Sequence, residues 1–186
     1  MKFLVTAALL TTALALPSAL RHAERARCDG STDPSTSAVE NAINTWIDDV
    51  KSVNFFLDNT PAIGTFALVQ RAQQALNSAN DEPNELNVLA SICELNSSPN
   101  SQYQNAVATL EQIFSNVPTS LQNIIKNSGN GGLVAADIQE INAVRCCSVL
   151  PSLDILFLQA AEDYGLVGVT GTSAPRPNAC SRFNCE

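Results

Sequence analysis

The stretch that decides the fold is DPSTSAVENAINTWIDDVKSVNFFLDN, residues 33–59. Its apolar side chains recur at alternating steps of four and three residues, which places them on one face of a helix. These side chains are Val39, Ile43, Trp46, Val50, Val53 and Leu57. We therefore expect an amphipathic helix that forms an outer wall of the protein and directs Trp46 toward the interior.

Working outward from this stretch, the same helical spacing recurs and no convincing alternating strand appears. Further helices are expected after Thr60, from about Pro83, after Ser98, near Leu121, from Leu133 and over 153–164. Asp33, Thr60 and Ser98 each precede a proline, so we expect them to cap helices, with Ser37 and Glu40 as an alternative capping box for the first. The sequence thus predicts an all-α, single-domain bundle of about six to seven helices.

Prolines and glycines predict where these helices end. Pro83 and Pro118 are expected to interrupt helices, and Pro151 to mark a bend or a new start. The segment 129–132 is too rich in glycine to be helical. Over two turns no polar face is left by Leu153, Ile155, Leu156, Phe157 and Leu158, which predicts that residues 153–161 form a central helix surrounded by the others.

The two ends of the chain differ from this helical part. Residues 1–15 resemble an export signal, with Lys2 followed by an apolar run too short to cross a membrane. Residues 16–32 are expected to be a pro-segment or flexible arm, 33–165 the bundle domain, and 166–186 a Gly/Pro/Ser-rich tail that is disordered or held by its cysteines. We expect an extracellular monomer without a transmembrane segment.

Six cysteines in an exported chain indicate disulfides rather than a metal site. They are Cys28, Cys93, Cys146, Cys147, Cys180 and Cys185. On a helix, neighbouring residues diverge by about 100°. We therefore expect the adjacent pair to bridge to two places, one cysteine to Cys93 and the other to the tail.

The net charge and the residue content argue against nucleic-acid binding and against histidine-based chemistry. The formal net charge is −8 without a basic cluster, so nucleic acid is an unsuitable partner. The one histidine, His22, lies in the expected arm, which argues against histidine-based catalysis and histidine-ligated zinc. We predict no catalytic, cofactor-binding or metal-binding residue and no cofactor.

Acidic pairs are the remaining acid–base option. The candidates are Asp48 with Asp49, Asp81 with Glu82 and Glu85, and Glu162 with Asp163. We expect these acids to lie on solvated helix faces or in first turns, with Asp81 and Glu82 directly before the third helix.

The apolar content allows either a plain core or a pocket for an acyl chain or sterol. If a pocket exists, Trp46, Val50, Leu156 and Phe157 are expected to line it. Asn96 begins an Asn-Ser-Ser acceptor pattern for N-glycosylation.

Four features of the chain carry a resemblance: the exported start, the Asp33-Pro34 opening, the helix from Trp46 to Leu57 with its NFFLD ending, and NDEPNEL at residues 80–86. They resemble small secreted proteins of filamentous fungi. A looser similarity is to the hydrophobic-surface-binding and cell-wall galactomannoprotein family. That resemblance implies a helical bundle that binds apolar surfaces or lipids.

Three functions therefore compete. The first is a secreted, non-enzymatic protein that binds a lipid, a sterol or a hydrophobic surface, at the cell wall or toward a host. The second is an effector or structural wall protein with a solid core that acts through protein contacts. The third is a hydrolase active in acid through paired carboxylates.

Overall fold

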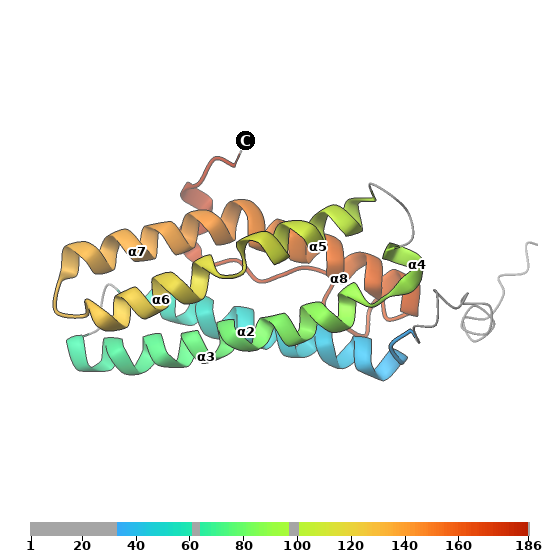
Figure 1. Cartoon of the computed structure of the whole chain (residues 1–186), viewed down its shortest axis with the longest axis horizontal. Helices are drawn as coiled ribbons and strands as arrows, with labels where there is room; N and C mark the ends of the chain where they lie inside the picture. The colour runs from blue at the N-terminus through green and yellow to red at the C-terminus, as the bar shows by residue number, and fades with distance from the viewer. Residues whose placement is uncertain (1–32, 61–63, 97–100, 186) are drawn as a thin grey trace, which may run out of the picture.

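The computed structural model describes residues 33–60, 64–96 and 101–185. These residues form an all-α bundle of four antiparallel rods (Figure 1). The first rod is α2 (Thr36–Asn59) and the second is α3 (Thr65–Ala90). After the short α4 (Cys93–Asn96), the third rod is α5 (Gln102–Ile113) followed by α6 (Asn116–Lys126). The expected signal and arm lie outside the described residues.

The fourth rod is one continuous helix interrupted by a wider turn. It comprises α7 (Gly131–Val144), the π-helical turn η2 (Arg145–Val149) and α8 (Leu150–Tyr164). The π turn ends two residues before Pro151, which has no N–H to bond to Cys147 and whose ring would collide with the carbonyl of Cys147 in a regular helix. The bend expected at Pro151 is therefore this local widening, without a break in the rod.

Several predicted helix boundaries are wrong. Pro83 lies on the exposed side of α3, and buried residues before and after it keep the helix continuous. Gly131 and Gly132 form the first turn of α7, because the side chain of Asn130 caps the N–H of Leu133. The break near Pro118 falls before it, at residues 114–115, so this proline occupies the first turn of α6.

The predicted caps are also displaced. Ser35 caps α2, while Asp33 accepts a hydrogen bond from the backbone N–H of Cys93. Thr60 follows the end of α2 and donates its hydroxyl to the carbonyl of Phe56, so it does not begin α3. Ser98 and Pro99 lie outside the described residues, and Ser101 caps α5.

The interior contains two apolar clusters, one at each end of the rods. One gathers Trp46 with residues of α5 and α8, and the other gathers Leu57 with residues of α3, α6 and α7. The prediction that residues 153–161 form a central helix is wrong, because α8 is one of the four rods and Leu158 on it is 41% exposed.

Residues 166–185 are ordered and tied to the bundle. Pro175 accepts a hydrogen bond from Asn54, Asp154 accepts one from the N–H of Ala174, and Asp58 accepts one from the N–H of Asn178. A Cβ added to Gly171 would lie 2.5 Å from Cδ1 of Ile47, so the tail passes close against α2. These contacts place the tail over α2 and α8.

Both adjacent cysteines bridge to this tail, through Cys146–Cys180 and Cys147–Cys185. The expected bridge from one of them to Cys93 is therefore wrong. Cys93 is also disulfide-bonded. Divergence on a helix did not separate the two bridges, because Cys180 lies in a short 3-10 helix, Asn178–Arg182, and Cys185 follows it, so both reach the adjacent pair from the same segment.

The rod Gly131–Tyr164 is long and apolar enough to cross a membrane by length and composition. More than half of its most apolar window, 56%, is buried inside the bundle. This burial is the pattern of a core helix, so its hydropathy is weak evidence for a membrane span.

Candidate functional site

The four side chains predicted to line a pocket lie together in the core. Trp46, Val50, Leu156 and Phe157 are all fully buried in the same apolar cluster. The indole of Trp46 stacks on Phe114, with ring centroids 6.0 Å apart, and meets the edge of Phe157 at 5.7 Å. The bundle is therefore solid around Trp46.

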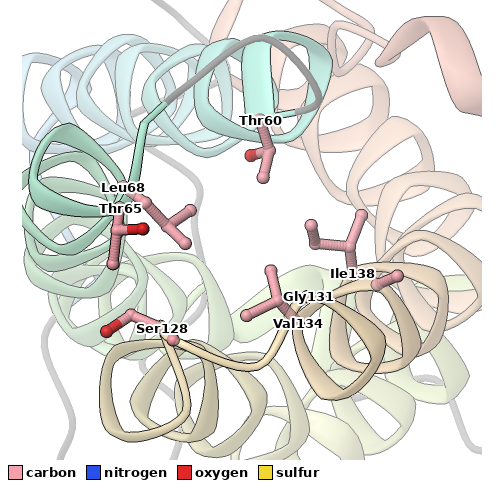
Figure 2. A pocket seen from close by; sticks show the side chains of 9 residues that line it. Thr60, Thr65, Leu68, Ser128, Gly131, Val134 and Ile138 are labelled. Atoms are coloured by element: carbon pink, nitrogen blue, oxygen red, sulfur yellow. The ribbon is translucent and has the colours of Figure 1, made fainter.

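A pocket of about 480 Å³ opens at the other end of the bundle. Figure 2 shows its wall, which is formed by Thr60 after the end of α2, by α3 and α7, and by the turn that follows α6. Leu68, Val134 and Ile138 point into it and supply its apolar surface. The other lining residues are Thr60, Thr65, Ser128, Gly129, Gly131 and Ala135.

The sequence builds this pocket with small residues between two helix ends. Gly129 lies between α6 and α7 and Gly131 is the first residue of α7, and a Cβ at either would meet nothing within 4 Å. Thr65 is the first residue of α3, and its neighbour Phe66 is 79% exposed. An apolar floor between small, polar rim residues is the usual composition of a small-molecule site.

A second candidate site lies between α2 and α3. The carboxylate oxygens of Asp49, Asp81 and Glu85 lie within 4.8 Å of one another. Burial raises the pKa of Asp49, while the Ser78 hydroxyl opposes this shift. Burial also raises the pKa of Glu85, to about 7, and the negative charges of Asp81 and Asp49 act in the same direction.

The expectation that these acids lie on solvated faces or in a first turn is wrong for Glu82 and Glu85. Both are inside the continuous α3 and are buried, with 3% and 7% of their surface exposed. The hollow above the acidic cluster is lined by Asp49, Asn77, Ser78, Asn80 and Asp81. Glu85 is not part of this lining. A hydrolase substrate bound in the hollow would therefore contact only Asp49 and Asp81 of the three acids.

A buried polar layer crosses the middle of the bundle. Nη1 of Arg145 lies 3.6 Å from Oε1 of Glu82, and Nη2 donates to Oδ1 of Asn54 at 3.1 Å. This layer was not predicted, although the sequence contains a signal for it. Arg145 follows Ile138 and Ile141 at helical spacing, and Glu82 lies between Ala79 and Leu86 on the buried face of α3.

The predicted glycosylation site is only partly described. Asn96 is the last residue of α4, and the serines that complete its acceptor pattern lie outside the described residues. No protein-family model, curated protein or solved structure matches this chain.

Proposed function

We propose that this protein is exported from the cell and binds a small apolar ligand, without catalysing a reaction. The observation that carries the proposal is the end pocket of about 480 Å³ with its floor of Leu68, Val134 and Ile138. This volume falls within the range of about 300–1,000 Å³ that is typical of ligand sites.

The rim suits a ligand that has one polar end. Thr65 and Ser128 place hydroxyl groups at the pocket, and the lining contains no charged side chain. The acyl chain of a lipid would therefore contact the apolar floor while its head group met the hydroxyls. The disulfides agree with an extracellular location, because such bonds persist in oxidising compartments.

A matched pair of variants tests this proposal. Ala135 and Ala136 are neighbouring exposed residues of α7, and only Ala135 lines the pocket. Ala135→Trp places a large side chain at the pocket, whereas Ala136→Trp adds the same side chain outside it. The probe is cis-parinaric acid, a fluorescent fatty acid, titrated into the purified protein.

We expect the unsubstituted protein and Ala136→Trp to bind the probe with equal affinity. We expect Ala135→Trp to bind it at least about tenfold more weakly, a loss of about 1.4 kcal/mol. Saturable binding that both variants retain would place the ligand elsewhere. Absence of binding to the unsubstituted protein would remove acyl chains as the ligand.

A further inference from the structure

The three clustered acids are brought together by two helices. Asp81 and Glu85 are four residues apart on α3 and therefore share one face of it. Asp49 reaches them from α2, the helix that packs beside α3. Three carboxylates at this spacing repel one another when ionised.

Glu85 is the acid that makes this cluster unusual. It is more than nine-tenths buried, and its Oε2 is buried without a hydrogen-bond partner. Besides burial and the N–H of its own backbone, the groups that act on Glu85 are Asp81, Asp49 and Glu82, all of them acids. Burial of such a carboxylate in its ionised form costs free energy of folding unless a positive charge is bound next to it.

Two basic side chains, Lys51 on α2 and Arg145 in the interior, have other partners. Lys51 forms an ion pair with Asp48 on the exposed side of α2. Arg145 pairs with Glu82 in the interior, at the polar layer. Neither cation pairs with Asp49, Asp81 or Glu85, so neither balances the charge of these three acids when they are ionised.

We propose that Asp49, Asp81 and Glu85 bind a divalent cation of the Ca²⁺ class. The donors are all hard oxygens, which Ca²⁺ prefers, and the hollow lined by Ser78 and Asn80 gives an ion and its waters a way in. The cation sits between α2 and α3 and links them. This site is separate from the apolar end pocket and does not depend on the proposed ligand.

The spacing favours Ca²⁺ over Mg²⁺. Two oxygens bound to one Ca²⁺ at about 2.3–2.6 Å can be at most about 4.6–5.2 Å apart. For Mg²⁺, at about 2.0–2.1 Å, the limit is about 4.2 Å. No two of the three oxygens are more than 4.8 Å apart, which is within the separation that two ligands of one Ca²⁺ can span, whereas Mg²⁺ demands a tighter cluster.

The experiment is calorimetric titration of CaCl₂, and separately of MgCl₂, into the protein at pH 7.5 after removal of cations by a chelator. Glu85→Gln removes the buried charge and keeps the shape. Asp48→Asn is the matched control, because Asp48 is the neighbour of Asp49 and its side chain is 76% exposed. Circular dichroism verifies that each variant is folded.

We expect the unsubstituted protein to bind Ca²⁺ with a Kd of about 10⁻⁴–10⁻³ M, the range of extracellular modules, and Mg²⁺ at least about tenfold more weakly. Glu85→Gln should weaken Ca²⁺ binding at least about tenfold, and Asp48→Asn should stay within about threefold. If Glu85→Gln does not fold, Asp81→Asn is used instead, because Asp81 is exposed. It should likewise weaken Ca²⁺ binding at least about tenfold.

Two results would overturn the proposal. The first is no Ca²⁺ binding to the unsubstituted protein at about 10 mM, which would mean that the acids share a proton instead. The second is equal Ca²⁺ affinity of the unsubstituted protein and Glu85→Gln, which would place the ion elsewhere on the acidic surface.

Discussion

Arg145 and Glu82 face each other in the middle of the bundle, with Nη1 of the arginine 3.6 Å from Oε1 of the glutamate. Both side chains are almost completely buried, which raises the pKa of Glu82, and the charge of Arg145 opposes this rise. The pair lies between the two apolar clusters and connects α3 to the π turn of the fourth rod. A polar contact at one level of an otherwise apolar interior favours one register of the rods.

Loss of one partner of this pair should be strongly destabilising. Arg145→Met leaves Glu82 buried without its counter-charge, and we expect the free energy of unfolding to fall by about 3–5 kcal/mol. The double variant Glu82→Met/Arg145→Met removes both charges and should be more stable than Arg145→Met alone. Urea unfolding of the two variants measures this difference. A double variant less stable than the single one would show that the charges do not act as a pair.

The raised pKa of Glu85 makes the stability of the cation-free protein depend on pH. The folded protein holds this proton up to about pH 7, whereas the unfolded chain releases it near 4.5. The folded state therefore binds more protons between these values, and its stability should fall as pH rises from about 4.5 to about 7. Urea unfolding in chelator at several pH values measures the slope. Glu85→Gln should flatten it, and an unchanged slope would assign the effect to other groups.

The two tail disulfides should contribute in a non-additive way. Their cysteines are adjacent at one end and close together at the other, so either bridge alone closes nearly the same loop of 34 or 38 residues. Replacing one pair by serine should cost about 2 kcal/mol, because the remaining bridge keeps the loop closed. Removal of both pairs should cost more than the two single losses together. Chemical unfolding of the three variants gives the comparison, and simple additivity would contradict the shared-loop argument.

The exposed Phe66 offers a test of surface binding at the pocket end. Its side chain is 79% exposed, so Phe66→Ser should change the free energy of unfolding by less than about 0.5 kcal/mol. If the protein contacts apolar surfaces through this end, Phe66→Ser should adsorb less to a hydrophobic sensor surface. Val169→Ser is the control, because Val169 is 64% exposed and comes shortly after α8, which ends at the opposite end of the bundle from the start of α3 (Figure 1). Equal adsorption of both variants would exclude this end as the contact.

Periodicity predicted the helical class well, because the stripe from Val39 to Leu57 is buried as expected. It failed where packing overrides a local signal. Pro83 and Gly131 are poor helix formers, yet α3 and α7 include them. Buried residues before and after Pro83 in the sequence keep α3 continuous. The side chain of Asn130 caps α7, so this helix begins with its two glycines.

The candidate sites depend on contacts between distant segments, which a one-dimensional pattern does not contain. Asp49 and Asp81 lie on different helices, and nothing in their local sequence shows that α2 and α3 place them together. The end pocket likewise joins Leu68 to Ile138 across two rods. The burial of Glu82 and Glu85 could have been predicted from the sequence, because both lie on the apolar face of α3.

The bridge from Cys147 to Cys185 has a mechanical consequence. A pulling force applied at Cys185 enters the bundle directly at Cys147, through a covalent bond. The residues from 148 to 184 then lie outside the loaded path, so α8 and the tail over it are shielded from stretching. The tension passes instead into the π turn at the middle of the fourth rod, beside the buried Arg145.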